Sequence, residues 1–398
     1  MTAAARPANS PFDLVLVGGG LQNGLIALRA LHAGAQRAGA GPNGGAYRVA
    51  LVEAEQQLGG NHTWCVHARD VPPESRAWFE PLIVRSWPAY DVRFPSFART
   101  LHSSYAVVTS ERFARVVTAA FEASEGSALF LGRRALRSAG HEVELDDGRM
   151  LSGNLVVDAR GPDPTACQAQ TGFQKFVGRE FRTERAHGLQ RPLLMDASCA
   201  QQGGFRFFYV LPLDADRLLV EETRFARSAT LDMADGRAAV EHYAARFGTL
   251  VECLREESGV LPMPWAGALP QHAAGAVLAA GYRGGYFHPA TGYSLPAALR
   301  AAEIIGADPT QIPMAERWQR FQRSHRAQVV YARQLNRLLF GGFADADMWR
   351  VFERFYRLPA GLIERFYAMS LSVPDRARVL IGRPPGGFSM SRMLSAGG

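Results

Sequence analysis

The chain begins with a pattern that is typical of a βαβ unit. Residues 14–17 form an uninterrupted apolar run, as expected for a strand that is buried on both faces. Three glycines at 18–20 follow directly, and leucines then recur at helical spacing over residues 21–33. A second strand is predicted at residues 47–52, and it ends at Glu53. The start of the chain therefore has the order of a βαβ unit: a strand, a glycine turn, a helix and a second strand that ends in a glutamate.

The middle of the chain alternates short β-type runs with turns, whereas its last part is helical. The β-type runs lie at residues 106–108, 143–145, 155–157, 205–210 and 217–220. From about residue 293 apolar positions again recur at helical spacing. Beyond Pro313 the predicted helices are aromatic and rich in arginine up to Arg383.

The first glycine turn has most of a dinucleotide-binding fingerprint. Gly18 and Gly20 fill the first two places of G-x-G-x-x-G, and Gly24 comes one step after the third place. Such glycines let the backbone approach a pyrophosphate, whose charge then lies at a helix N-terminus. Glu53 is placed to bind the ribose hydroxyls of an adenosine, and an extra loop predicted at 34–46 accounts for its late position. The residues therefore predict dinucleotide binding, against the alternative of an ordinary α/β turn.

A second glycine-rich segment, at residues 281–296, suggests that the dinucleotide is FAD rather than NAD. The first unit begins close to the N-terminus, and this downstream segment then offers a second approach to a flavin. Gly281, Thr291 and Gly292 are its candidate cofactor contacts, and Pro296 suits the first turn of a following helix.

Composition narrows the class of protein only a little. The 398 residues are 47% apolar with a net charge of +7, which suits an anionic partner such as a phosphate-bearing cofactor, an acidic membrane face or a nucleic acid. The four cysteines are scattered without a CxxC pair, and no metal-ligand spacing appears. Neither a signal peptide nor an apolar run long enough to span a membrane is present, so the expected location is cytoplasmic.

Several long motifs resemble those of the bacterial lycopene β-cyclases. They are GGNHTW (59–64), WPAYDVRFP (87–95), VVDARG (156–161), LLVEET (218–223), GYFHPATGYSLP (285–296) and RFYRLP (354–359). The similarity runs from about Asp13 to Pro385, which is nearly the whole chain.

The resemblance implies a fold, a reaction and a set of site residues. The fold would be α/β (α+β), with a Rossmann-like FAD-binding domain of the hydroxylase and geranylgeranyl-reductase kind, a mixed-sheet substrate domain and a helical C-terminal part. The reaction would convert the ψ-ends of lycopene, by way of γ-carotene, into β-rings without net redox change, using reduced FAD and NAD(P)H as the electron donor. Beyond the glycines and Glu53, the implied cofactor-binding residues are Arg112 and Asp158, and the implied essential carboxylate is Glu221.

The expected organisation has six segments: a disordered leader (1–12), a FAD-binding βαβ region (13–84), a mixed β-rich region (85–280), a flavin-facing loop and helix (281–310), a basic helical membrane-facing region (311–383) and a loose tail (384–398).

Ring closure through a carbocation needs an acid, a base and a dry apolar pocket. Glu221 and Glu222 are neighbours on a predicted strand, so only one of them can face the pocket, and alternation alone does not decide which. His288 is a third catalytic candidate, although histidines in glycine-rich turns often serve only as hydrogen-bond anchors. Phe207, Tyr209 and other aromatic residues could stabilise a cation, or could simply be strand core.

The expected partners are lycopene, γ-carotene and a lipid surface. An aromatic, arginine-rich helix in region 311–383 suits an anionic membrane, although the same stripe could pack on the protein body. A flavin monooxygenase or reductase of the same fold is the main alternative enzyme. A nucleic-acid-binding protein is disfavoured, because the charge is dispersed and no binding motif appears. The oligomeric state is not predicted.

Overall fold

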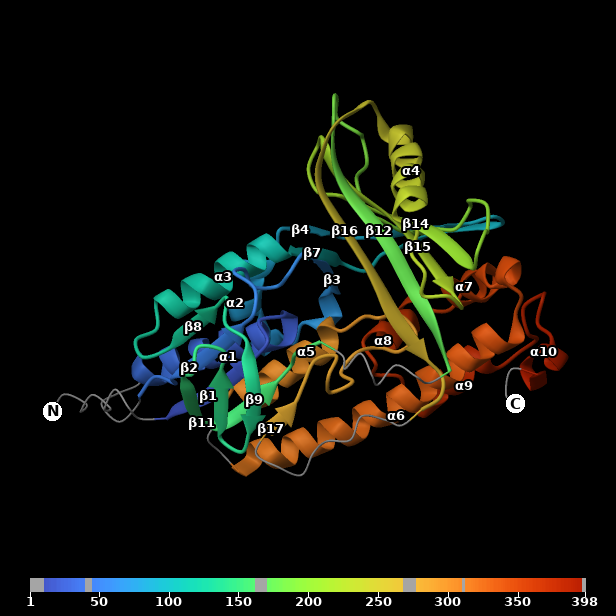
Figure 1. The fold of residues 1–398 in the computed structure, drawn as a ribbon. Helices are drawn as coiled ribbons and strands as arrows, with labels where there is room; N and C mark the ends of the chain where they lie inside the picture. The colour runs from blue at the N-terminus through green and yellow to red at the C-terminus, as the bar shows by residue number, and fades with distance from the viewer. Residues whose placement is uncertain (1–10, 40–44, 162–169, 268–276, 310–311, 396–398) are drawn as a thin grey trace.

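The computed structural model describes residues 11–39, 45–161, 170–267, 277–309 and 312–395, and these form two main sheets and a helical part (Figure 1). The first sheet runs in the order β8 (Ala128–Leu131), β2 (Val49–Glu53), β1 (Phe12–Val17), β11 (Met150–Asp158), β10 (Glu142–Leu145) and β9 (Ala135–Ala139), with β17 (Val277–Ala279) also on β11. Its strands β8, β2, β1, β11 and β17 are parallel. This parallel arrangement explains the uninterrupted apolar run of β1, because both faces of that strand are covered.

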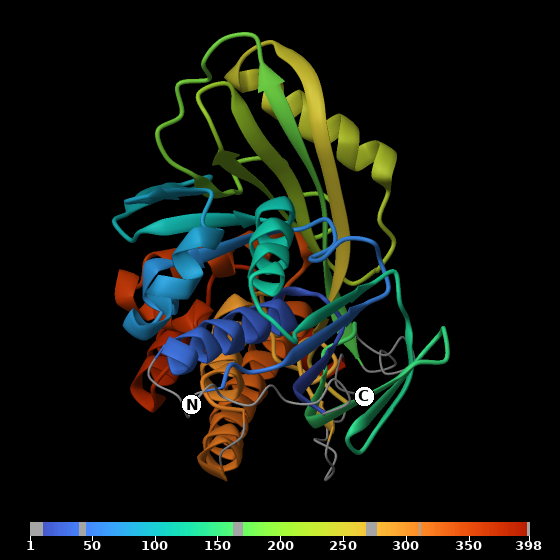
Figure 2. The ribbon, with the colours of Figure 1, turned by 90° about the vertical axis from the view of Figure 1, so that its left-hand side faces the viewer.

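The second sheet is antiparallel for most of its width and stands away from the body, with one helix on its outer face (Figures 1 and 2). Its order is β16 (Leu250–Pro264), β12 (Thr171–Thr183), β15 (Arg217–Ala226), β14 (Phe205–Pro212), β13 (Leu193–Asp196), β5 (Tyr90–Phe94) and β6 (Phe97–Leu101). A third, small sheet joins β3 (Thr63–His67), β7 (Tyr105–Thr109) and β4 (Arg85–Trp87).

Helices cover these sheets and form the C-terminal part. They are α1 (Leu21–Gly39), α2 (Arg76–Phe79), α3 (Ser110–Glu122), α4 (Met233–Ala244), α5 (Leu295–Ala301), α6 (Ile312–Gly342), α7 (Trp349–Tyr356), α8 (Ala360–Tyr367), α9 (Val373–Leu380) and α10 (Met390–Ser395). One core lies between the first sheet and helices α1, α3 and α5, and another lies between the inner face of the second sheet and helices α6 and α7. Helix α4 packs on the outer face of the second sheet.

Most of the predicted strands are present, but three sequence-based boundaries were wrong. Helix α1 continues to Gly39, through much of the predicted 34–46 loop, because an alanine-rich stretch is a good helix former and Gly34 fits tightly against the backbone of Tyr47. Phe12 already belongs to β1 rather than to the leader, of which residues 1–10 lie outside the described part. Within the predicted loose tail, residues 390–395 form α10, and Phe388 packs against Phe343 of the body.

The arginine-rich helix α6 does not offer its aromatic stripe to the exterior. Trp318, Phe321, Tyr331 and Phe340 are all less than 10% exposed, because they pack against the protein body. The alternative considered for this stripe, packing on the body, is therefore the observed one.

Candidate functional site

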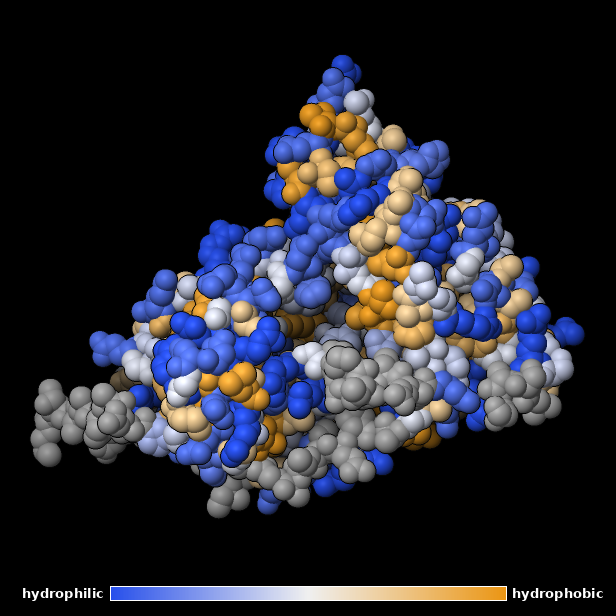
Figure 3. Space-filling model, in the orientation of Figure 1, coloured by the Kyte–Doolittle hydropathy of each residue, from blue (hydrophilic) through white to orange (hydrophobic). Residues whose placement is uncertain are grey.

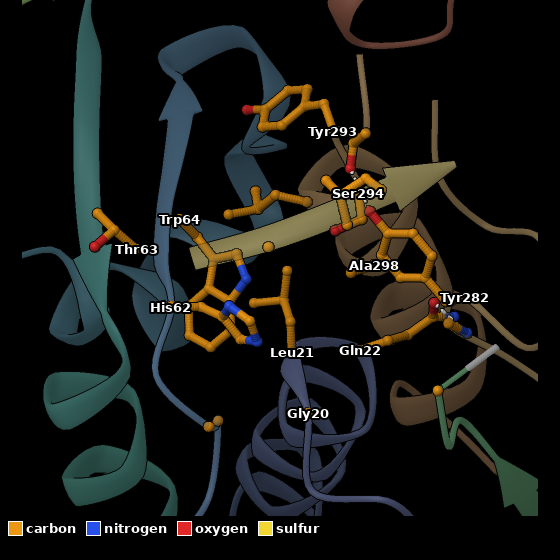
Figure 4. Close-up of a pocket in the computed structure, with 18 of the residues that line it drawn as sticks. Gly20, Leu21, Gln22, His62, Thr63, Trp64, Tyr282, Tyr293, Ser294 and Ala298 are labelled. Carbon is orange, nitrogen blue, oxygen red and sulfur yellow. Dashed lines mark hydrogen bonds between the residues drawn. The ribbon is translucent and has the colours of Figure 1, made fainter. Parts of the chain in front are cut away.

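A cavity of about 910 Å³ lies between the first glycine turn and the inner face of the second sheet. Its lining includes Gly18, Gly20 and Glu53 at one end, and Phe207 and Glu221 at the other. Figure 3 shows the molecular surface hollowed between the body and the upright sheet. Figure 4 shows the middle of the cavity, where aromatic and polar side chains from distant parts of the chain face one another.

The glycine turn leaves open space in front of the N-terminus of α1. Gly18 has φ +96°, and a Cβ there would lie 3.1 Å from the backbone nitrogen of Arg160. Gly20 is exposed, and a Cβ there would meet no atom within 4 Å. The Gly19 N–H donates to Glu53 Oε2 (2.6 Å), which fixes the carboxylate at the cavity wall. These residues form a cradle that suits a pyrophosphate and its adenosine.

Gly24, unlike Gly18 and Gly20, lies at the contact between two helices. It does not line the cavity, and an added Cβ would lie 2.1 Å from Cζ of Phe113, a fully buried ring of α3. Its lack of a side chain therefore allows α1 and α3 to pack closely.

The downstream glycine segment also lines the cavity, next to the start of α1. Gly281 has φ +57°, and its N–H donates to Gln22 Oε1 at the start of α1 (2.7 Å). Gly292 has φ +69°, and its carbonyl accepts a hydrogen bond from the Tyr282 hydroxyl (2.7 Å). Thr291 lines the cavity between them. The two glycine motifs, far apart in sequence, thus bound one space.

Three other predicted residues lie outside the cavity lining. His288 is 2% exposed, its Nδ1 accepts from the Ala290 N–H (3.1 Å), and burial lowers its pKa to about 3. It is a neutral anchor of the turn and does not touch the cavity. Asp158 is paired with Arg160 (2.7 Å), and its carbonyl accepts from the Ala280 N–H, so it fixes the start of the Gly281 loop. Arg112 lies in the first turn of α3, where its N–H donates to the Thr109 hydroxyl.

Strand β15 directs its two glutamates to opposite faces of the second sheet. Glu221 lies on the face of Leu219 and Phe225 and lines the cavity. Glu222 lies on the face of α4, is 4% exposed, and pairs with Arg206 and Arg224. The register therefore resolves the choice that alternation alone left open, and Glu221 is the carboxyl at the cavity.

The Glu221 carboxyl has the electrostatic properties of a proton donor. Enclosure by the protein raises its pKa to about 8, and the nearby Glu257 carboxylate acts in the same direction. The Thr223 hydroxyl donates to Glu221 Oε1 and opposes the shift, but less strongly. The carboxyl is therefore mainly protonated at neutral pH and can give its proton to a bound molecule.

Of the groups around Glu221, the sequence pointed to Tyr209 and Phe207 but not to Cys65 or Tyr105. The Tyr209 hydroxyl is 2.8 Å from Cys65 Sγ and 3.2 Å from the Tyr105 hydroxyl, and all three residues line the cavity. Phe207 lies on the same wall, whereas Phe208 faces α4. Only strand register could have revealed this cluster, since the three residues come from three different strands.

Comparison with known proteins gives one consistent family. Residues 13–394 match the family model described as lycopene cyclase protein. The chain is 42% identical over 379 residues to a lycopene beta-cyclase of Pseudescherichia vulneris (94% of each chain), and 41% identical to that of Pantoea ananas (94% of this chain, 95% of the other). A lycopene beta-cyclase of a Paracoccus species is 39% identical over 388 residues (94% of each chain).

Solved structures that share the fold are much more distant in sequence. A geranylgeranyl bacteriochlorophyll reductase-like protein of Thermoplasma acidophilum has a TM-score of 0.59 at 11% identity, covering 97% of this chain and 96% of its own. A probable FAD-dependent monooxygenase of Pseudomonas aeruginosa has a TM-score of 0.56 at 18% identity, covering 81% of this chain and 95% of its own. The predicted fold class is thereby confirmed.

Proposed function

The chain belongs to the lycopene cyclase family, and we propose that it closes the ψ-ends of lycopene into β-rings, passing through γ-carotene to β-carotene. The observation that carries this function is the place of Glu221 at the wall of a cavity with an aromatic side, where burial raises the pKa of its carboxyl to about 8. The three relatives at 39–42% identity, all lycopene beta-cyclases, support the same reaction over that of a flavin monooxygenase.

Glu221 starts the reaction by protonating the terminal double bond of the polyene. The resulting cation is attacked by the neighbouring double bond, so that a six-membered ring closes and the charge moves into the ring. The Glu221 carboxylate left by the first step then accepts a ring proton, which gives the β-end, and the sequence of steps leaves the oxidation state unchanged. The aromatic rings of Phe207 and Tyr209 line the same wall as Glu221 and stabilise the cation by cation–π attraction. The aromatic and apolar lining around Glu221 also limits capture of the cation by water.

We assign FAD to the glycine-lined end of the cavity. Gly18 and Gly20 with the start of α1 would hold its pyrophosphate, Glu53 its ribose, and the Gly281 and Gly292 turns its flavin end. Gly20 in particular leaves open space where a side chain would stand. Bound in the reduced form, with NAD(P)H as the source of electrons, FAD would supply an electron-rich ring that stabilises positive charge on the substrate.

The function is tested by the pigments of a lycopene-accumulating bacterium that expresses the chain. We expect lycopene to disappear and β-carotene to accumulate, with γ-carotene as the intermediate. Unchanged lycopene in the presence of folded, flavin-loaded protein would contradict the proposal. Consumption of NAD(P)H in proportion to product would instead indicate a monooxygenase or reductase.

Isotope labelling distinguishes proton transfer from hydride transfer. In deuterated water with unlabelled reductant, we expect each new ring to gain one deuterium at the carbon that accepts the first proton. With deuterated reductant in ordinary water, no label should enter the ring, because the reaction involves no net reduction. Mass spectrometry of the β-carotene reads both results, and deuterium from the reductant on the ring would overturn the mechanism.

We further propose that α9 and the residues after it contact the lipid surface from which the insoluble substrate is collected. Val373, Leu380 and Ile381 are 75%, 46% and 70% exposed, and the exposed Arg378 and Arg383 lie beside them. Apolar side chains flanked by arginines suit a membrane with anionic lipid. Within the described residues, no helix is long and apolar enough to span a bilayer.

Changing Val373, Leu380 and Ile381 together to Ser is expected to weaken binding to anionic vesicles about ten-fold or more, because each buries apolar area in the lipid. Cosedimentation with vesicles measures the effect. A matched triple variant, with Leu136, Met150 and Val251 changed to Ser, removes equally exposed side chains elsewhere and should bind like the parent. Equal loss in both variants would contradict the assignment of this surface.

A further inference from the structure

In the second sheet, strand β12 carries a glycine that lies between two glutamates of its neighbouring strands. Strand β12 lies between β15 and β16 and is antiparallel to both. Gly178 of β12 pairs with Glu221 on one side and with Glu257 on the other. Residues paired directly across neighbouring strands share one face of a sheet. Glu221 and Glu257 therefore stand on the same face, with Gly178 between them.

Because Gly178 has no side chain, no atoms of this residue lie between the two glutamate side chains above the sheet. An added Cβ would lie 3.1 Å from Glu257 Cγ, 3.4 Å from Glu257 Oε1 and 3.5 Å from Glu221 Cβ. Glu257 thus leans into the space above the glycine, toward the strand that carries Glu221. A larger residue at position 178 would fill this gap and separate the two groups.

Burial raises the pKa of Glu257, whereas Arg255 and Thr63 oppose this shift and support the ionised carboxylate. Glu257 is 5% exposed, and its Oε2 accepts from the Thr63 hydroxyl (3.0 Å) and from Arg255 Nη1 (2.8 Å). Among the described residues, the other charged or titratable groups around this pair include Glu180 and Glu111, which lie 3.6 and 3.8 Å from Arg255. His62 and Cys65 lie on the neighbouring segment, and the Tyr209 and Tyr105 hydroxyls lie beside Cys65, with Tyr209 paired to Glu221 across the strands. Glu221 has no such cation among the described contacts that act on it, and only a hydroxyl supports its ionised form.

We propose that Glu257 is a positioning residue of the cyclisation: its carboxylate, held by Arg255 and Thr63, keeps the proton on Glu221 across the gap at Gly178. This role rests on the proposed function, in which Glu221 is the acid. Two carboxyl groups that share one enclosed space cannot both ionise readily, so the one with the cation takes the charge and the other takes the proton. The shift of the Glu221 pKa to about 8, in which the Glu257 charge is the second cause after burial, agrees with this division.

The test is the pH dependence of kcat in Glu257→Gln, measured on the FAD-loaded enzyme with lycopene in vesicles. Activity requires protonated Glu221, so it is present below the Glu221 pKa and lost as the pH rises through it. Removing the Glu257 charge lowers that pKa, and we expect the alkaline limb to move down by about one unit. At pH 8 this shift corresponds to roughly a five-fold lower rate relative to the parent, with much less loss at pH 6.

Two further variants separate electrostatics from structure. Glu256→Gln makes the same chemical change one residue away, on the opposite face, where Glu256 pairs with Arg237; its alkaline limb should stay in place. Glu257→Asp keeps the charge but withdraws it by one methylene, and its limb should fall between those of the parent and Glu257→Gln. If Glu257→Gln fails to fold, the Asp variant still tests the direction of the shift.

Infrared spectroscopy gives a readout besides activity. The band of a protonated carboxyl that is absent in Glu221→Gln should titrate at lower pH in Glu257→Gln than in the parent. An unmoved limb and an unmoved band, in variants that still cyclise lycopene, would overturn the role of Glu257 and leave the proposed function intact. A parent enzyme that forms no β-carotene would overturn the proposed function itself.

Discussion

Glu221→Gln is expected to slow β-ring formation by at least about 100-fold while leaving a folded, flavin-binding protein. The amide has the same shape as the protonated carboxyl and can still accept from Thr223, but it has no acidic proton to give. Loss of a general acid costs about 10²–10⁴-fold in rate. Because the Glu221 carboxyl is largely neutral at pH 7, its replacement by a neutral amide should change the melting temperature little. Chromatography of pigments formed by the purified enzyme measures the loss.

The neighbouring glutamate provides the matched control. Glu222 is buried on the opposite face and pairs with Arg206 and Arg224, so Glu222→Gln removes charge from an ion-paired cluster. We expect it to lower the free energy of unfolding by about 1.5–3 kcal/mol while the folded fraction keeps its kcat. Full cyclase activity in Glu221→Gln would show that Glu221 is not the acid. Loss of cyclase activity in a folded Glu222→Gln would contradict a purely structural role for Glu222.

Local patterns predicted the first βαβ unit and several short strands, because each pattern reports on burial of its own segment. They did not reveal the two longest strands, β12 and β16, or helices α3 and α4. The apolar run at β1 follows from cover on both faces of that strand, and the predicted run at residues 217–220 forms the first part of β15. The two glycine motifs were recognised separately, and the structure brings them to one cavity. The extension of α1 to Gly39 also has a local cause, because the helix propensity of residues 35–38 outweighs the glycines that suggested a loop.

The interactions that tune the site could not be predicted, because they depend on strand register. Nothing in the sequence predicts that Gly178, Glu221 and Glu257 are neighbours. The pairing of β12 with β15 and β16 brings them side by side. The face chosen by Glu221 has the same origin. For α6 the difficulty was of another kind: an amphipathic aromatic stripe has the same pattern whether it meets lipid or protein, and only tertiary packing distinguished the two.

The glycines of the first turn also share a pattern but have separate physical tasks. Gly20 faces open space at the cavity, so a larger side chain there meets no protein atom and would conflict only with the proposed FAD. Gly24 faces the buried ring of Phe113, so a larger side chain there conflicts with the packing of α1 on α3. One motif therefore combines a binding requirement with a folding requirement, and the two can be separated by substitution.

Gly20→Leu should fold normally yet bind FAD at least about 100-fold more weakly, because the leucine occupies the space assigned to the pyrophosphate. Gly24→Ala should instead lower the free energy of unfolding by about 1–3 kcal/mol by overpacking against Phe113, while its folded fraction keeps FAD. Flavin absorbance after desalting and thermal melts of the FAD-free protein measure the two effects. If Gly20→Leu retained FAD with parental affinity, the cofactor would not lie at this turn, and the direction assigned to it along the cavity would have to change.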